Sequence, residues 1–182
     1  MKAKSLPNRE AVESFGDSDH LRFLADGMLG KLTRWLRMLG QDVKYSNSLD
    51  DPELLMIAKK EKRILLTRDF ELYQRANARG IDAFYLEGLT EEEKLAELAK
   101  RYDVRLEIDM ASSRCPKCNS TVKPTSRKGA EDKVERSTFD HYKEFWKCPN
   151  CGQIYWQGAH WARIRKTLNA AKQILEETER EK

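Results

Sequence analysis

A short apolar run leads directly into an amphipathic pattern in residues 21–40, LRFLADGMLGKLTRWLRMLG. The run at 21–25 is typical of a buried strand, and it ends at Asp26. Over residues 28–39, leucines recur at spacings of three and four, which predicts a helix with one apolar face. Gly40 then ends the helix, because glycine readily adopts the left-handed conformation that follows a helix C-terminus.

The alternation of strand and helix continues to about residue 110. Further strands are predicted at 42–45, 64–67 and 83–86, and 105–108 is a last candidate. Further helices are predicted to start at Asp51, to span 70–79, and to run from Thr90 to about Arg101. Asp51 before Pro52 is interpreted as a helix N-cap, and Thr90 to Glu93 as a capping box. About four such strand and helix units predict a parallel, three-layer α/β sheet, in which functional groups gather beyond the carboxyl ends of the strands.

This pattern divides the chain into four parts. Residues 1–20 are polar and aperiodic and are interpreted as a flexible extension. Residues 21–110 form the α/β domain, and residues 111–161 form a small module around four cysteines. Residues 162–182 are predicted to form a terminal helix, with apolar residues along one side.

Composition limits the class of protein. The chain has 182 residues, of which 40% are hydrophobic and 35% charged, and no stretch resembles the ~20 apolar residues of a membrane helix. The first residues lack the apolar segment of an export signal, so we expect a cytoplasmic protein. Residues 1–110 hold 19 Lys and Arg against 21 Asp and Glu, whereas residues 111–182 hold 15 against 9. This asymmetry favours catalysis in the first part and binding of a polyanion in the second.

Three aspartates occupy corresponding places in the predicted sheet. Asp26 follows the first strand, Asp51 opens a helix, and Asp69 follows the strand at 64–67. Clustered carboxylates stay ionised together only around a cation, and hard ions such as Mg²⁺ or Mn²⁺ prefer such oxygen ligands. Two ions about 4 Å apart can activate water against a phosphodiester. The alternative is that each aspartate only caps a helix or a turn.

The predicted helix at 28–39 carries three cations opposite its apolar face, Lys31, Arg34 and Arg37. A cationic face directly after Asp26 would suit a phosphate backbone. The alternative is an ordinary solvated helix face.

Two matching CxxC motifs predict a zinc site, with Cys115 and Cys118 in the first and Cys148 and Cys151 in the second. Four thiolates leave no open position on the metal, so the ion would be structural. The intervening residues 119–147 are expected to hold a hairpin or a mobile loop. The module is also rich in aromatic residues, which either stack on bases or form its small core; for Trp146 and Tyr155, next to the motifs, we favour the core.

Several of these motifs together resemble the Mut7-C RNase family. The resemblance lies in residues 23–40, in Arg63-Ile64-Leu65-Leu66-Thr67-Arg68-Asp69, and in the two cysteine motifs with their flanks, 114–119 and 148–161. It covers about residues 21–165.

The resemblance implies a PIN-like nuclease domain followed by a zinc ribbon. It places catalytic acids at Asp26, Asp51 and Asp69, with Asp50 as an alternative to Asp51, and implies cleavage that leaves a 5′-phosphate and a 3′-hydroxyl. A fourth acid is usual in PIN-type sites, and the candidates are Glu71, Asp82 and Glu87.

The sequence therefore predicts a Mg²⁺- or Mn²⁺-dependent ribonuclease, an endonuclease by preference, whose zinc ribbon assists binding to RNA or a ribonucleoprotein. Lys31, Arg34, Arg37 and Arg68 would contact the RNA backbone. The rival hypothesis is a non-catalytic adaptor that binds RNA or the ribosome through the zinc ribbon. A third is a toxin-like nuclease that a partner keeps silent.

Overall fold

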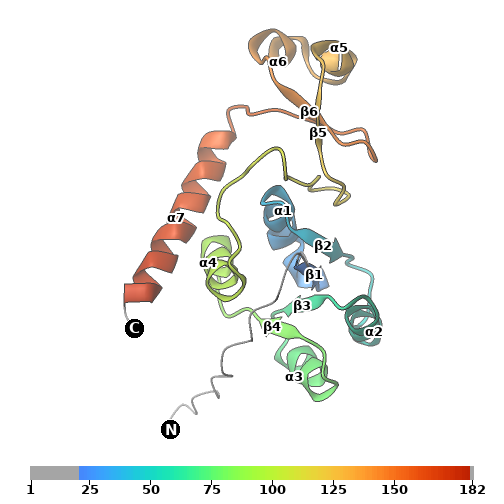
Figure 1. Cartoon of the computed structure of the whole chain (residues 1–182), viewed down its shortest axis with the longest axis vertical. Helices are drawn as coiled ribbons and strands as arrows, with labels where there is room; N and C mark the ends of the chain where they lie inside the picture. Colours follow the sequence, from blue (N-terminus) through green and yellow to red (C-terminus); the bar gives the residue numbers. More distant parts are fainter. Residues whose placement is uncertain (1–20, 181–182) are drawn as a thin grey trace.

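The computed structural model describes residues 21–180, and the predicted N-terminal extension lies outside them. A four-stranded sheet with the order β2-β1-β3-β4 forms its centre, and all neighbouring strands are parallel (Figure 1). The strands are β1 (Arg22–Ala25), β2 (Asp42–Tyr45), β3 (Ile64–Thr67) and β4 (Ala83–Tyr85). The predicted parallel α/β sheet is therefore confirmed.

Helices cover both faces of this sheet. They are α1 (Gly30–Met38), which follows the 3-10 turn η1 (Gly27–Leu29), then α2 (Asp51–Glu61), α3 (Phe70–Ala78) and α4 (Glu91–Tyr102). The side chains of α1 and α4 share one buried cluster with the sheet, and those of α2 and α3 share another. The sheet is thus the middle of three layers.

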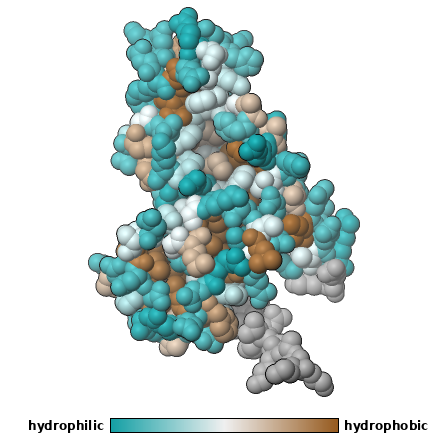
Figure 2. Space-filling view, turned by 180° about the vertical axis from the view of Figure 1, so that it is seen from behind, coloured by the Kyte–Doolittle hydropathy of each residue, from teal (hydrophilic) through white to brown (hydrophobic). Residues whose placement is uncertain are grey.

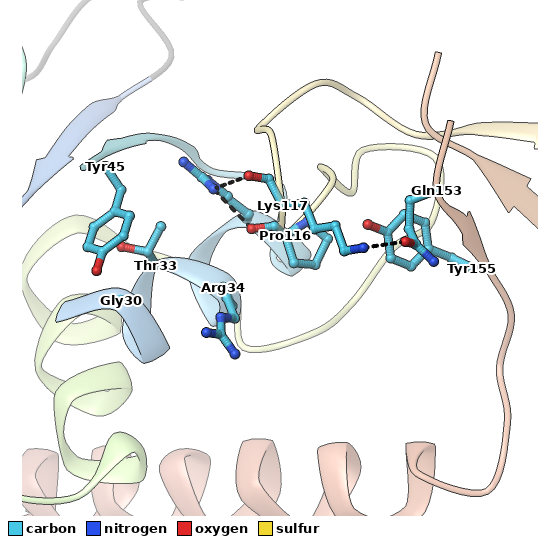
Figure 3. A pocket seen from close by; sticks show the side chains of 9 residues that line it. Gly30, Thr33, Arg34, Tyr45, Pro116, Lys117, Gln153 and Tyr155 are labelled. Carbon is cyan, nitrogen blue, oxygen red and sulfur yellow. Dashed lines mark hydrogen bonds between the residues drawn. The ribbon is translucent and has the colours of Figure 1, made fainter. Parts of the chain in front are cut away.

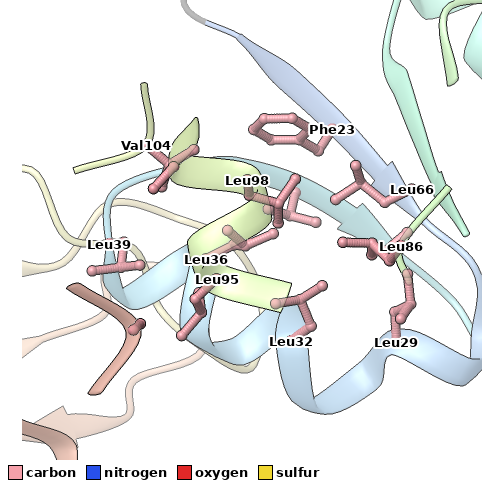
Figure 4. Packing of buried hydrophobic residues seen from close by; sticks show 14 of the residues in the cluster. Phe23, Leu29, Leu32, Leu36, Leu39, Leu66, Leu86, Leu95, Leu98 and Val104 are labelled. Atoms are coloured by element: carbon pink, nitrogen blue, oxygen red, sulfur yellow. The ribbon is translucent and has the colours of Figure 1, made fainter. Parts of the chain in front are cut away.

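Successive side chains along a strand point alternately into the two clusters. Phe23 and Leu66 point to the α1 and α4 side, whereas Leu24 and Leu65 point to the α2 and α3 side, and all four are fully buried. Figure 4 shows the first of these clusters, in which leucines of α1 and α4 meet side chains of the sheet. Burial on both faces explains why these parallel strands are continuous apolar runs in the sequence.

The predicted strand at 105–108 is wrong. These residues follow α4 without pairing to the sheet. Val104 and Leu106 are buried in the α1 and α4 cluster, and Ile108 packs against it. The apolar residues alternate because every second side chain faces this cluster, so the period of two arises without a strand.

The cysteine module is a small antiparallel sheet with the order β5-β6-β7, from β5 (Lys123–Thr125), β6 (Phe145–Lys147) and β7 (Ile154–Tyr155). We call residues 111–160 the ribbon. The insert between the cysteine motifs pairs β5 with β6, as expected for a hairpin. It also carries α5 (Arg127–Ala130), η2 (Glu131–Lys133) and α6 (Arg136–His141). Arg127 holds this tip together: its guanidinium lies 4.2 Å from the centre of the Phe139 ring and donates to the carbonyls of Phe139 and Tyr142.

The terminal helix is α7 (Trp161–Arg180), which runs beside α4 (Figure 1). Leu168 and Ala171 of α7 are buried in the cluster that α4 shares with the sheet. Thr167 adds a hydrogen bond of 3.0 Å to Glu92 of α4. The predicted terminal helix is therefore present over the described residues.

Hydrophilic residues cover most of the face seen in Figure 2, and the hydrophobic ones form separate patches. Within residues 21–180, no helix has both the length and the apolar character needed to cross a membrane.

Candidate functional site

Asp26 is held at the carboxyl end of β1 and is only 4% exposed. One carboxylate oxygen, Oδ1, accepts the backbone N–H of Met28 at 2.8 Å and so caps η1. The other oxygen, Oδ2, accepts the hydroxyl of Thr67 and the backbone N–H of Arg68 at 3.3 Å. A single carboxylate thus joins the ends of the neighbouring strands β1 and β3.

Asp69 lies beside Asp26 but has a different local role. Its backbone N–H donates to the Thr67 hydroxyl at 2.9 Å, so this hydroxyl links the two aspartates. Its side chain is exposed and accepts the N–H of Leu72 at 3.0 Å, which makes Asp69 the N-cap of α3.

Asp51 does not cap α2, so that prediction is wrong. The cap is Asp50, which forms a capping box with Glu53: Asp50 accepts the backbone N–H of Glu53 and Glu53 accepts that of Asp50. Asp51 stands inside the first turn and forms an ion pair of 2.7 Å with Arg75 of α3. Both partners are 41% exposed, so the pair is a surface one.

At the Asp26 end of the sheet, the connections after two neighbouring strands go to opposite faces. The chain leaves β1 toward α1 on one face of the sheet, and it leaves β3 toward α3 on the other face. The loops after these neighbouring strands therefore diverge, and in open α/β sheets ligands bind beyond the strand ends at such a point. Asp26, Thr67 and Asp69 stand at this switch point.

Among the described residues, the three predicted catalytic aspartates do not form a group whose ligand atoms all lie within 4.8 Å of one another. Over residues 21–180, one group of three or more His, Cys, Asp or Glu side chains brings its ligand atoms within 4.8 Å of one another, and it consists of cysteines. Both Asp26 oxygens accept hydrogen bonds and Asp51 is paired with Arg75. Whether Asp26, Asp51 and Asp69 share a Mg²⁺ or Mn²⁺ ion therefore stays a prediction.

The candidates for a fourth acid occupy different ends of the sheet. Asp82 precedes β4 and therefore stands at the amino end, away from Asp26. Glu87 follows β4 and Glu71 lies in the first turn of α3, so both belong to the carboxyl end.

The cations of α1 separate into two groups. Lys31 and Arg34 are exposed, as predicted, but Arg37 is 6% exposed. The Arg37 guanidinium donates to the carbonyl of Val43 in β2 through Nε and Nη2, at 3.0 and 2.7 Å. Through Nη1 it donates to the carbonyls of Pro116 and Lys117, at 2.9 and 3.3 Å.

Arg37 is therefore a structural link between α1, β2 and the first cysteine motif, and it does not lie on the solvated face where the helical wheel placed it. Its contact with RNA stays a prediction. The helical wheel fails because it places α1 against the sheet alone, whereas the ribbon covers a second side of α1. Burial desolvates the Arg37 guanidinium and lowers its pKa. The negative charges of Cys115, Cys118 and Asp42 act in the opposite direction but do not outweigh the desolvation.

Arg68 is the fourth predicted contact for RNA. Its backbone N–H donates to the Asp26 carboxylate. Its side chain is partly exposed, and within the described residues its buried Nε has no hydrogen-bond partner.

The four cysteines form the group of ligand atoms noted above. The Sγ atoms of Cys115 and Cys151 are 3.5 Å apart, and those of Cys118 and Cys148 are 3.3 Å apart. A tetrahedral zinc ion with Zn–S bonds of about 2.3 Å spaces its sulfur ligands about 3.8 Å apart. The four thiols thus fit a zinc ion with a small outward adjustment, and the set leaves no position for substrate.

The thiols differ in how readily they ionise. Burial raises the pKa of Cys148 to about 12. Desolvation also acts on Cys118, but hydrogen bonds from the Ser120 backbone and the Asn150 side chain outweigh it and lower the pKa of Cys118 to about 5. Trp146 and Tyr155 pack around the cysteines, as expected, but both are only partly buried, so part of each side chain stays accessible.

The first cysteine motif is fixed to the α/β domain by more than Arg37. The Asn119 amide donates to Asp42 at 2.7 Å and its oxygen accepts the N–H of Val43 at 3.2 Å. Arg114 donates through its backbone to Arg37 at 2.8 Å, and the Ser113 hydroxyl donates to the Met38 carbonyl at 2.6 Å. The ribbon is thus attached directly to α1 and β2.

A cleft of about 680 Å³ lies where α1 and β2 meet the two cysteine motifs (Figure 3). We call it the α1–ribbon cleft. Its lining consists of Gly30, Thr33, Arg34, Arg37, Tyr45, Pro116, Lys117, Gln153 and Tyr155.

The sequence predictions missed Tyr45, Lys117 and Gln153 as members of one surface. Tyr45 ends β2 in register with Ala25, so its place at the carboxyl edge follows from the strand pairing. Lys117 and Gln153 come from the two cysteine motifs and meet through a hydrogen bond of 2.6 Å. Only the zinc site, which brings the motifs together, would have indicated that contact.

Comparison with known proteins gives one match. The family model described as the Mut7-C RNAse domain matches residues 21–168, which include the four-stranded sheet and the ribbon. No curated protein and no solved structure matches the chain.

Proposed function

Because the chain belongs to the Mut7-C RNase domain family, we propose that it is a ribonuclease that hydrolyses RNA phosphodiester bonds at the switch point of its sheet. The observation that carries this proposal is the placement of Asp26. A nearly buried carboxylate stands where β1 and β3 end, inside the region that the family model matches. Side chains at this point of an open α/β sheet typically bind the ligand.

The neighbouring groups support the same assignment. Thr67 and two backbone N–H groups fix the Asp26 carboxylate, and Asp69 adds a second, exposed carboxylate next to it. Lys31 and Arg34 of α1 present cations to solvent, and Arg68 follows β3. We propose that these cations attract the RNA backbone, with Asp26 acting on the scissile phosphodiester.

The proposal retains a PIN-like arrangement and endonucleolytic cleavage that leaves a 5′-phosphate and a 3′-hydroxyl. It also retains zinc in the ribbon and a cytoplasmic setting, since free thiols are typical of reducing compartments. The proposal also retains Asp26, Asp51 and Asp69 as ligands of a catalytic Mg²⁺ or Mn²⁺ ion, and the cleavage assay tests the need for that ion.

The test is cleavage of a labelled single-stranded RNA by the full-length protein, with Mg²⁺, with Mn²⁺, or in buffer freed of divalent ions. Asp26→Asn is expected to lower the cleavage rate by about a hundredfold or more, the scale of a lost acid or base in catalysis. Asparagine is also a good N-cap, so η1 is expected to remain folded.

The matched control is Asp140→Asn, the same chemical change on exposed α6 of the ribbon. It is expected to leave the rate unchanged. Equal cleavage by wild type and Asp26→Asn would contradict the proposed site, and Asp51→Asn tests in the same assay whether that acid takes part.

A second candidate function is a non-catalytic adaptor that binds RNA or a ribonucleoprotein such as the ribosome. One observation favours it. Asp26, Asp50 and Asp69 each cap a helix or a turn, and Asp51 forms an ion pair with Arg75. RNA binding without cleavage in every divalent ion tested would favour the adaptor.

A further inference from the structure

The α1–ribbon cleft is cationic. Three of its lining residues are Arg or Lys, and none is Asp or Glu. Two other clefts of the described residues differ: one of about 500 Å³ includes Asp42, Asp103 and Glu107, and one of about 380 Å³ includes Glu87, Glu93 and Glu97. A cleft with cations and no acid is suited to an anionic ligand.

Two of the cations are available to a ligand. Arg34 is exposed, and among residues 21–180 it forms no ion pair. Lys117 is exposed and oriented by Gln153, an uncharged partner that leaves its charge uncompensated. Arg37, by contrast, already donates hydrogen bonds to backbone carbonyls. Both line the cleft, Arg34 from α1 and Lys117 from the ribbon, and Figure 3 shows the Lys117 side chain turned toward Gln153.

The cleft has an aromatic residue on each of its two sides, and one of them contacts the turn that follows β1. Tyr45 donates its hydroxyl to the carbonyl of Gly27 at 3.1 Å, and Gly27 directly follows Asp26. Tyr155 stands on the ribbon side, with its hydroxyl 3.0 Å from the Sγ atom of Cys115. The two aromatic walls of the cleft thus contact the turn after Asp26 and the cysteine site, respectively.

Gly30 keeps this passage open. A Cβ at residue 30 would lie 2.6 Å from the Tyr45 hydroxyl oxygen and 3.0 Å from the ring carbon that bears it. Any larger side chain would therefore push the Tyr45 ring or fill the cleft. Thr33, also on the wall, has a buried hydroxyl that lacks a partner within the described part of the chain.

We propose that the α1–ribbon cleft binds an unpaired segment of the RNA strand, adjacent to the bond presented to Asp26. Arg34 and Lys117 would hold its phosphates, and Tyr45 and Tyr155 would offer rings to its bases. This proposal rests on the proposed function for its substrate class. A cationic groove with aromatic side chains is the arrangement by which proteins bind single strands. A duplex keeps its bases stacked inside and gives these rings nothing to contact.

The test measures binding of a fluorescein-labelled, unstructured RNA by fluorescence anisotropy. It uses the full-length protein in the Asp26→Asn background, so that the RNA stays intact. Arg34→Ala combined with Lys117→Ala is expected to weaken binding by about tenfold or more at low salt. The slope of log K against log salt is expected to shrink by about 1.4, since each lost phosphate contact on a single strand accounts for about 0.7.

The matched control is Lys59→Ala combined with Lys60→Ala, which removes two exposed cations from α2 on the other face of the sheet. A loss equal to that of the cleft variant would overturn the proposal, and so would equal affinity for a duplex of the same sequence. Gly30→Ala tests the cleft without changing charge: it is expected to weaken binding while the salt slope stays constant.

This experiment separates the two proposals. If wild type cleaves RNA but the cleft variant binds as the control does, the cleft assignment fails and the nuclease stands. If wild type cleaves nothing but the cleft variant loses affinity, the nuclease fails and the cleft stands.

Discussion

Cys148→Ser is expected to abolish stoichiometric zinc binding and to unfold the ribbon. Cys148 is fully buried, with its Sγ 3.3 Å from that of Cys118. The buried cluster around it is small, with Cys115 and Val122 as its other buried members. A module with so little core depends on its metal, and a structural zinc site contributes about 10–16 kcal/mol in zinc-finger peptides.

The measurement is metal content by mass spectrometry, together with limited proteolysis of the same protein. Wild type is expected to carry about one zinc per chain, and Cys148→Ser well under one, with new cleavage within 111–160. Gln157→Ser, an exposed substitution in the same module, is the control and is expected to resemble wild type. Wild-type protein that lacks zinc, or a protected ribbon in Cys148→Ser, would contradict the prediction.

The central sheet was predictable because its local signals agree with its tertiary environment. The strand 64–67 was predicted at the position observed, since burial on both faces makes it a continuous apolar run. The strand 42–45 was also predicted at its observed position, although Val43 is its one fully buried residue. The strand expected at 105–108 was wrong because an alternating pattern reports which side chains are covered, not whether the backbone pairs.

The candidate site was predictable in part. Strand ends were enough to place Asp26 and Asp69 together at one edge, where Thr67 joins them. The cap of α2 was misplaced by one residue, although Asp50 and Glu53 stand at the spacing of a capping box and would have identified it. The ion pair of Asp51 with Arg75 links two helices and has no local signal.

The burial of Arg37 could not be predicted, because it depends on a segment about 80 residues further along the chain. Pro116 and Lys117 offer their carbonyls only once the first cysteine motif has folded onto α1. The same holds for the α1–ribbon cleft, whose walls come from three separate parts of the sequence. Local patterns describe each wall but not the space between them.

Arg37→Ala is expected to lower the free energy of unfolding of the zinc-loaded protein by about 3 kcal/mol. The substitution removes a buried cation that donates to three backbone carbonyls, those of Val43, Pro116 and Lys117. Hydrogen bonds that involve a charged group contribute about 1.5–3 kcal/mol each, and a buried acceptor left without its donor adds a desolvation cost. Some relaxation of the first motif would keep the loss below the sum of these terms.

Urea unfolding followed by circular dichroism measures this loss, and two further variants show whether it comes from the link itself. Arg34→Ala removes an exposed arginine from the preceding turn of the same helix and is expected to change stability by less than about 0.5 kcal/mol. Arg37→Lys keeps the charge but loses the planar fork that reaches β2 and the ribbon together, so it is expected to recover only part of the stability. If Arg37→Ala were as stable as Arg34→Ala, the ribbon would be held to α1 and β2 by the contacts of Asn119, Arg114 and Ser113 alone.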